Sequence, residues 1–367
     1  MSVERVLIMA AGTGGHVFPA LAIARQLEAH GVKVDWLGTP NGMENRLLEG
    51  SGIPVHTIDA KGLKGKGLSR LLGAPWMLMR SLWQSLAILR AVQPDCVLGM
   101  GGYVSGPGGL AAKLLGRRLV LHEQNAVAGL SNRALALLAD DVLEAFPDTF
   151  KAGPRVLAVG NPVRADIEAL GDTLPALAPA SRPLRLLVLG GSQGAQAINR
   201  VLPAALSRMQ QQAGSMPEVR HQTGAAQLDD ALAAYSDAGV EIGANLSVSA
   251  FIDDMAAAYA WADLVLCRSG ASTVSELAVA GRPSLLVPYP YHKDQQQHHN
   301  ARWLSAVGGA IVIEQAALES AQLAAQLLAL DTGREALHAM ALAAHARAQR
   351  GVDVRIAALL RGKGDAR

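Results

Sequence analysis

The sequence predicts an α/β protein built of two doubly wound halves. Short continuous apolar runs, which are typical of strands buried on both faces, alternate with helical stretches from residue 5 onward. Gly160, Asn161 and Pro162 break this alternation, and it restarts near residue 182. A chain of 367 residues is long enough for two domains of ordinary size.

The first half opens with a strand, a glycine turn and a helix. Pro19 suits the first position of that helix and Gly31 suits its end, so residues 5–38 predict one right-handed βαβ unit. The strands expected in this half are residues 5–11, 32–38, 95–100, 118–123 and 141–146.

The second half repeats the order of strand, glycine turn and helix within residues 182–206. Further strands are expected at residues 218–223, 246–251, 263–269, 283–289 and 309–314, and the chain after about residue 333 is expected to be helical throughout. The predicted domains are residues 1–161, joined by a helical tail at 343–367, and residues 162–342.

The composition is that of a globular enzyme, with 50% hydrophobic residues, 17% charged residues and a net charge of +2. This small charge gives no reason to expect nucleic acid as a partner. Cys96 and Cys267 lie in short apolar runs, so we expect buried, inert thiols and a reducing compartment. No apolar stretch reaches the roughly 18 residues of a membrane-spanning helix, and the N-terminus makes a poor signal peptide.

Three glycine-rich turns, at residues 12–16, 99–109 and 190–196, each follow a strand and open a helix. Glycine lets the backbone approach a phosphate, and the helix N-terminus adds partial positive charge. None of the turns is a Walker A loop or a dinucleotide fingerprint, and Asp35 lies within a strand rather than at a ribose site. The turns therefore favour phosphate handling over simple tight turns, and they disfavour a nicotinamide cofactor.

Polar residues follow two of the first-half strands. His16 ends the first glycine turn, and a histidine there could take a proton from an attacking hydroxyl. The alternative is a helix-start histidine bonded to the backbone. Asn125, in the stretch 122–129, could bond a sugar hydroxyl or amide, or could simply be a turn asparagine.

The stretch 268–281 is the richest in the second half. Ser272, Thr273 and the free N–H groups of a helix start suit a diphosphate, and Glu276 suits the two hydroxyls of a ribose. Residues 273–276 also match a capping box, and both interpretations can hold together. Residues 288–300 carry three glutamines and Asn300, which suit sugar hydroxyls, while the histidine spacing there matches no standard zinc site.

An apolar and basic stretch lies at residues 70–90 and continues at 113–118. Apolar residues at helical spacing usually belong to a core, whereas tryptophans among arginines suit a surface that meets anionic lipid. The candidates for membrane contact are Trp76, Met79, Arg80, Trp83, Arg117 and Arg118.

The segments "GTGGHVFPALA", "GMGGYVSGPGGLAA", "HEQNAVAG", "GNPVR", "GGSQGAQ" and "RSGASTVSELA" together resemble the MurG family, bacterial transferases that act on lipid I in peptidoglycan synthesis. The resemblance spans nearly the whole chain. It implies a GT-B glycosyltransferase fold, with two Rossmann-like domains facing a cleft. It also implies inverting transfer of GlcNAc from UDP-GlcNAc, held by the C-terminal half, to the muramyl 4-hydroxyl of lipid I, held by the N-terminal half, which gives lipid II.

The same resemblance implies site residues. Thr13, Gly14, Gly15 and Asn125 would contact the donor sugar, Arg164 and Ser192 the diphosphate, and Ile252 the uracil through its backbone. Diphosphate and ribose would be held by Ala271, Ser272, Thr273, Val274, Ser275 and Glu276. Gln296 or Gln297 would hold the GlcNAc hydroxyls, although many relatives have a histidine where Gln296 aligns. The acceptor diphosphate would meet Gly101, Gly102, Tyr103 and Ser105.

The implied partners are UDP-GlcNAc, lipid I, the cytoplasmic side of the anionic inner membrane, and cell-wall and division proteins, with no metal and no cofactor. The alternatives are a UDP-GlcNAc epimerase or another transferase of the same fold, a dinucleotide oxidoreductase, and a non-catalytic scaffold for wall assembly. The apolar stretch disfavours a soluble-substrate epimerase, and the missing ribose acid disfavours the oxidoreductase.

Overall fold

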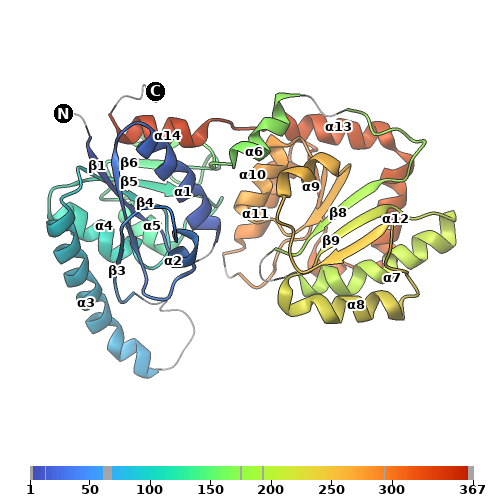
Figure 1. The fold of residues 1–367 in the computed structure, drawn as a ribbon, viewed down its shortest axis with the longest axis horizontal. Coiled ribbons are helices and arrows are strands. Elements are labelled where there is room, and N and C mark those ends of the chain that lie inside the picture. Colours follow the sequence, from blue (N-terminus) through green and yellow to red (C-terminus); the bar gives the residue numbers. More distant parts are fainter. Residues whose placement is uncertain are drawn as a thin grey trace. The chain divides into compact units, whose positions relative to one another are not determined.

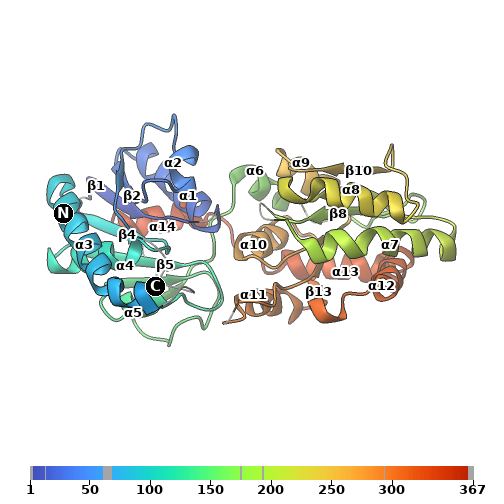
Figure 2. The same cartoon turned by 90° about the horizontal axis from the view of Figure 1, so that it is seen from below.

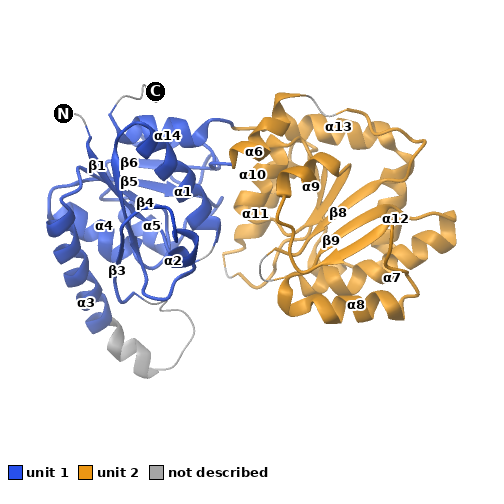
Figure 3. Ribbon diagram, viewed as in Figure 1, with its two compact units in different colours: residues 1–163, 350–367 blue, residues 164–349 orange. Residues whose placement is uncertain are grey.

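The computed structural model describes residues 3–12, 14–60, 68–173, 176–191, 194–292 and 294–362. The chain forms two compact units, unit 1 with residues Met1–Val163 and Arg350–Arg367, and unit 2 with residues Arg164–Gln349 (Figure 3). Both boundaries fall later along the chain than the sequence predicts. The tail is also not helical throughout, because the chain leaves the helix at residues 346–351. Helix α13 (Arg334–His345) stays in unit 2, where the ring Nε2 of His345 donates to the Gly171 carbonyl at 2.9 Å.

Unit 1 holds a parallel sheet whose strands run in the order β3-β2-β1-β4-β5-β6-β7. The strands are β1 (Arg5–Met9), β2 (Lys33–Gly38), β3 (Val55–Thr57), β4 (Cys96–Gly99), β5 (Arg118–Glu123), β6 (Asp141–Glu144) and β7 (Val156–Ala158). All five strands expected in this half are present. β3 and β7 were not predicted, because each has three residues and is only partly buried, so neither leaves a continuous apolar run.

The helices of unit 1 cover both faces of this sheet (Figures 1 and 2). They are α1 (Gly14–Ala29), α2 (Met43–Leu47), α3 (Leu68–Val92), α4 (Ser105–Leu114), α5 (Leu130–Leu135) and α14 (Val352–Leu360). Val6 and Ile8 pack with α1 and α14, whereas Leu7 and Met9 pack with α3, α4 and α5. This alternation follows from the two-residue period of a strand, and it buries both faces.

Helix α1 begins at Gly14, so Pro19 lies inside it rather than at its first position. A proline cannot make the bond to the carbonyl four residues earlier. Here that carbonyl belongs to Gly15, which is exposed in the first turn, where water can satisfy it. The earlier start places His16 within the first turn of the helix rather than before it.

Unit 2 holds a second parallel sheet, with strand order β10-β9-β8-β11-β12-β13. The strands are β8 (Arg185–Leu189), β9 (Glu218–Gln222), β10 (Leu246–Ser249), β11 (Leu264–Cys267), β12 (Ser284–Leu286) and β13 (Ala310–Val312), all at predicted places. The remaining elements are α6 (Ala165–Glu168), η1 (Ala169–Asp172), α7 (Gln196–Ala213), η2 (Ala225–Gln227), α8 (Leu228–Asp237), α9 (Met255–Trp261), α10 (Ala271–Val279), α11 (Gln296–Ser305), η3 (Gln315–Ala317) and α12 (Ser320–Thr332).

The core of unit 2 follows the same rule as that of unit 1. Leu186 and Val188 of β8 pack with apolar residues of α7 and α12. Among the remaining helices, α9 contacts β8 and α6, and α10 contacts α6, α11 and α13. The two cysteines are buried and free, as predicted, and burial raises the pKa of Cys96 to about 12. Such thiols are poor nucleophiles at neutral pH.

Candidate active site

Each sheet has one place where its strand order reverses, between β1 and β4 in unit 1 and between β8 and β11 in unit 2. Sheets of this kind bind ligands beyond the carboxyl ends of the strands at that reversal. The three glycine turns follow β1, β4 and β8, and the stretch that begins at Arg268 follows β11. All four therefore lie at the ligand-binding positions of their own units.

In unit 1 the loop after β4 lies against the start of α1. Gly101 and Gly102 have φ angles of +98° and +84°, which glycine adopts readily. A Cβ on Gly101 would lie 3.1 Å from Cε1 of His16, and a Cβ on Gly102 would collide with the Ala11 carbonyl oxygen. Only glycines allow this approach, so the loop restricts the imidazole ring of His16.

Ser105 fixes the same loop through the backbone of Gly101. Its hydroxyl donates to the Gly101 carbonyl at 2.8 Å and accepts from the Gly101 amide at 3.1 Å, and the side chain is fully buried. The neighbouring Tyr103 is 56% exposed. Of the four residues expected at the acceptor diphosphate, Ser105 thus shapes the loop, while Tyr103 offers a side chain to solvent.

The loop after β5 is organised by Glu123, whose role the sequence did not reveal. Its buried carboxylate accepts hydrogen bonds from the Asn125 and Gly129 amides and from the Asn132 side chain, each at 3.0 Å. The Asn125 side-chain amide also lies 3.2 Å from Glu123 Oε1. Asn125 is therefore held in place by a neighbour two residues earlier.

In unit 2 the first turn of α10 follows β11 directly. Gly270 occupies the N-cap position without a side-chain hydrogen bond, so the capping box predicted for residues 273–276 does not form. The helix begins at Ala271, which puts Thr273 inside the first turn instead of at the cap. Val274 and Ser275 are buried, and the Ser275 hydroxyl donates to the Ala271 carbonyl at 3.0 Å.

Ser272 and Thr273 are half-buried on this turn, and Glu276 follows one turn later. Tyr259 of α9 donates a hydrogen bond to Glu276 Oε2 at 2.9 Å. Burial raises the pKa of Glu276 above its ordinary value of 4.5, and the Tyr259 bond and the charge of Arg164 oppose that rise. The structure thus brings Arg164 and Glu276, which the sequence named, together with Tyr259, which it did not.

The start of α11 is tied to the same loop. The Ser269 hydroxyl donates to the Gln297 carbonyl at 2.7 Å, and the buried Asn300 side chain donates to the Ser269 carbonyl at 3.2 Å. Asn300 thus supports the loop and does not face a sugar. The Gln297 side-chain oxygen accepts from the Tyr289 amide at 2.9 Å, which leaves Nε2 as the donating end of that amide. Gln296 is the first residue of α11.

The glycine loop after β8 is fixed by Gln222, at the end of β9. Its side chain accepts from the Gly191 amide at 3.2 Å and donates to the Gly191 carbonyl at 3.1 Å, as a neighbouring strand would. Ile252 is half-buried in the segment between β10 and α9. Thr13 and Ser192, both expected to contact the donor, lie outside the described residues.

A hollow of about 580 Å³ in unit 2 is lined by α6, η1 and α9. Three carboxylates, Asp166, Asp253 and Asp254, line it. Such an acidic lining does not suit a diphosphate.

Exposed apolar side chains occur on α3, α4 and α5, which contact one another in that order, and in the turn after α5. We call these side chains the apolar face: Trp76, Leu78, Met79, Trp83, Leu110, Leu114, Leu130, Leu137 and Leu138, each between 38% and 78% exposed. Arg80 lies beside it in an ion pair with Asp59, and Arg117 is half-buried. Arg118 instead bonds Asp141 and the Leu359 carbonyl, so its guanidinium is committed to the fold.

Within the described ranges, no group of three or more His, Cys, Asp or Glu side chains is arranged to hold a metal ion. In the same part of the chain, no helix has both the length and the apolar character to cross a membrane.

Two parallel-sheet units with glycine loops at their strand reversals define the class of this protein. The N-terminal domain model of glycosyltransferase family 28 matches residues 6–144, and the C-terminal domain model of that family matches residues 185–355. The chain is therefore a family 28 glycosyltransferase with the GT-B fold.

The UDP-N-acetylglucosamine–N-acetylmuramyl-(pentapeptide) pyrophosphoryl-undecaprenol N-acetylglucosamine transferase of Azotobacter vinelandii is 53% identical over 336 residues, 92% of each chain. The enzyme of the same name from Chromohalobacter salexigens is 52% identical over 95% of this chain and 93% of its own. The crystal structure of Acinetobacter baumannii MurG superposes with a TM-score of 0.80, at 42% identity over 98% and 99% of the two chains. This chain belongs to the MurG family.

More distant structures share the fold alone. The calicheamicin glycosyltransferase CalG4 is 17% identical with a TM-score of 0.69, covering 99% of this chain and 98% of its own. A putative UDP-N-acetylglucosamine 2-epimerase from Listeria monocytogenes is 16% identical with a TM-score of 0.68, covering 99% and 97%. The fold is thus compatible with an epimerase, but the sequence is much more similar to the transferases, at 53% identity against 16%.

Proposed function

We propose that this enzyme transfers GlcNAc from UDP-GlcNAc to the muramyl 4-hydroxyl of undecaprenyl-diphosphate-linked MurNAc-pentapeptide, lipid I, and so makes lipid II for peptidoglycan synthesis. One observation carries the proposal: a transferase named for this reaction is 53% identical over 92% of both chains. The geometry of each unit supports it, with a nucleotide site in unit 2 and a proton acceptor in unit 1.

In unit 2, α10 receives the donor. The N-terminal turn of this helix presents backbone N–H groups and the Ser272 and Thr273 hydroxyls to the diphosphate, and the Glu276 carboxylate accepts from the ribose hydroxyls. As the bond between the anomeric carbon and the diphosphate breaks, negative charge grows on the leaving UDP. Fixed N–H dipoles at a helix N-terminus stabilise that charge without reorganising.

In unit 1, His16 acts as the general base. The muramyl hydroxyl oxygen attacks the anomeric carbon from the face opposite UDP, so the configuration inverts and a β-1,4 bond forms. The hydroxyl proton moves to His16, and UDP leaves with the electron pair of the broken bond. Gly101 and Gly102 bring the backbone loop beside His16, where the diphosphate of the acceptor can bind.

The apolar face supports attachment to the cytoplasmic side of the inner membrane, where lipid I is anchored. Its two tryptophans, at 72% and 64% exposure, are side chains that favour the membrane interface. Arg80 and Arg117 supply positive charge for anionic head groups. Cell-wall and division proteins are proposed as further partners.

The test is transfer of radiolabel from UDP-GlcNAc to a lipid I analogue. We expect labelled disaccharide lipid and UDP in equal amounts. Label that stays in free sugar, or conversion of UDP-GlcNAc to its 2-epimer, would establish the alternative reaction on the same fold.

A further inference from the structure

We infer that Gln124 and His122 are positioning residues that fix the ring tautomer of His16, so that the lone pair for the incoming proton lies on Nε2. The inference rests on the proposed function, in which His16 is the base. It concerns three side chains joined in a row, from Gly160 through His122 and Gln124 to His16.

The first group of the row, the Gly160 carbonyl, can only accept a hydrogen bond. The Gly160 carbonyl oxygen lies 2.8 Å from His122 Nε2, so Nε2 must carry a hydrogen. His122 is fully buried, and burial lowers its pKa to about 4, which keeps the ring neutral at pH 7. A neutral ring with a hydrogen on Nε2 has a lone pair on Nδ1.

The orientation of the Gln124 amide follows next. Its nitrogen lies 3.0 Å from His122 Nδ1 and 3.2 Å from the His122 carbonyl oxygen. Both of those atoms are acceptors, so the end of the amide facing them must be the NH₂ group. The opposite orientation would place the amide oxygen against two lone pairs. The amide is therefore fixed by a backbone carbonyl, which cannot change its role.

The Gln124 side-chain oxygen then determines which ring nitrogen of His16 carries the hydrogen. The Gln124 side-chain oxygen lies 2.8 Å from His16 Nδ1, and an amide oxygen only accepts, so Nδ1 carries the hydrogen. In the neutral ring the lone pair is then on Nε2. Among the described residues, no side chain or backbone group forms a hydrogen bond with Nε2, which remains available to substrate.

The row is rigidly supported. Gln124 is 1% exposed, and the Asn161 side chain donates to the Gln124 carbonyl at 2.9 Å. Gly101 packs on the His16 ring and restricts its rotation. A base held in one tautomer and one orientation spends no free energy on reaching its reactive form at each turnover.

Gln124→Met tests the inference because it keeps the side-chain length and removes the amide hydrogen bonds to His16 and to His122. We expect kcat with the lipid I analogue to fall about tenfold or more, with KM for UDP-GlcNAc within about twofold. The matched control is Gln26→Met, on the same helix as His16, which removes only the 3.0 Å bond to Asp353. That control should keep the wild-type kcat.

A structural role alone would not change the tautomer, so the second readout is ¹⁵N NMR of histidine-labelled, ligand-free protein. His16→Gln identifies the His16 signals. We expect a protonated Nδ1 and an unprotonated Nε2 in the wild type and in Gln26→Met, and a mixture in Gln124→Met. A wild-type His16 protonated on Nε2, or an unchanged kcat in Gln124→Met, would overturn the inference.

The two claims fail separately. Loss of the proposed function would appear as a wild-type enzyme that makes no labelled lipid, whereas the tautomer is read without substrate. If Gln124→Met does not fold, the wild-type NMR spectrum still decides.

Discussion

The Tyr259 hydroxyl donates to Glu276 Oε2 at 2.9 Å, which joins α9 to the helix that we assign to the nucleotide. Glu276 is held although burial disfavours its charged form, and only one of its oxygens is used by Tyr259. A carboxylate kept at such a cost is typical of binding sites rather than of cores. Tyr259 therefore holds Glu276 in place within the fold, and we assign the other carboxylate oxygen of Glu276 to the ligand.

Glu276→Gln is expected to weaken UDP binding without weakening the fold. The raised pKa means that the folded state prefers the protonated carboxyl, so this group stabilises at low pH and costs stability as the pH rises through the raised pKa. At pH 7 a neutral glutamine removes that cost. We expect an equal or higher Tm, together with UDP affinity about 10- to 100-fold lower from the lost charged hydrogen bonds.

Calorimetric titration of UDP across the acidic range checks the sign. Wild-type affinity should decline as the pH falls through the raised pKa of Glu276, and Glu276→Gln should show a flatter profile. Equal affinity of the two proteins at pH 7 would remove Glu276 from the site.

His16→Ala is expected to reduce kcat about 10²-fold or more, because it removes the proton acceptor. KM for UDP-GlcNAc should stay within about threefold, since the diphosphate and ribose are assigned to unit 2 and binding is largely retained when only a base is lost. Steady-state kinetics with a lipid I analogue measure both values. A near-normal kcat would assign the base to another residue.

The local sequence predicted where the loops of the site lie, but not which distant side chains hold the site residues in place. A strand, glycines and a helix start are consecutive, so the loops after β1, β4 and β8 could be found without a structure. Gln124 acts on His16 across 108 residues, and Tyr259 acts on Glu276 from a different helix. Neither pairing leaves a local pattern.

Two polar residues of helices that follow strands were assigned to the ligand, although they hold the backbone: Asn300 and Ser105 bond carbonyl groups of neighbouring loops. Gln222, to which the sequence assigned no role, bonds both the amide and the carbonyl of Gly191. A loop that must hold a fixed shape needs such support as much as it needs contacts to substrate. Sequence position alone does not distinguish the two roles, because both occur in the loops and helix starts that follow strands.

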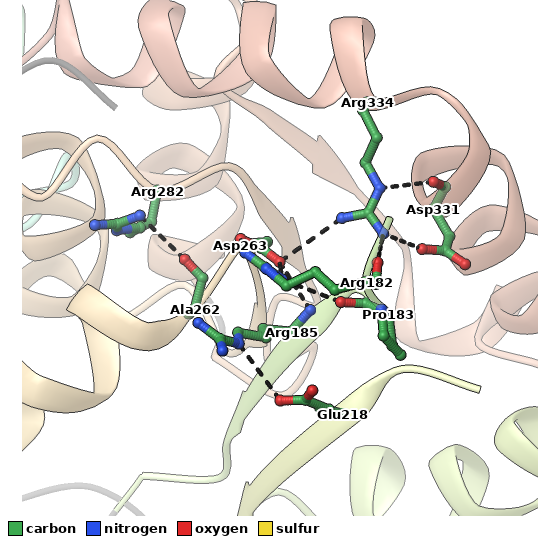
Figure 4. Close-up of polar contacts among 9 residues, drawn as sticks. All are labelled: Arg182, Pro183, Arg185, Glu218, Ala262, Asp263, Arg282, Asp331 and Arg334. Carbon is green, nitrogen blue, oxygen red and sulfur yellow. Dashed lines mark hydrogen bonds and ion pairs between the residues drawn. The ribbon is translucent and has the colours of Figure 1, made fainter. Parts of the chain in front are cut away.

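Asp263 directly precedes β11 and lies beside Arg182, Arg185 and Arg334 (Figure 4). Arg182 approaches both carboxylate oxygens, at 2.6 and 2.8 Å, and the Arg185 amide donates at 2.9 Å. The buried Arg334 guanidinium lies 3.7 Å away. We expect Asp263→Ala to lower the free energy of unfolding by about 3–5 kcal/mol, because the half-buried Arg182 loses its carboxylate partner and the buried Arg334 is left with Asp331 alone.

Glu218→Ala is the matched control in the same network (Figure 4). It removes one partly exposed contact, 3.4 Å from Arg185, and should cost no more than about 1 kcal/mol. Chemical denaturation of both variants gives the comparison. Equal losses would mean that Asp263 contributes no more than a surface pair.

The apolar face is expected to bind anionic vesicles. Replacing Trp76 and Trp83 with serine removes large exposed apolar surfaces, so the fraction that sediments with anionic vesicles should fall. Leu342→Ser, at an exposed leucine of unit 2, is the control and should leave it unchanged. Activity on a water-soluble acceptor should be retained in the tryptophan variants and in the control. Wild-type sedimentation of the tryptophan variants would contradict membrane contact through this face.

A crystal structure with bound UDP-GlcNAc will show whether the first turns of α10 hold the uridine nucleotide. We expect the diphosphate within hydrogen-bond distance of the backbone N–H groups and hydroxyls of Ser272 and Thr273, and the ribose hydroxyls on the Glu276 carboxylate. A nucleotide bound at any other part of the chain would contradict this assignment.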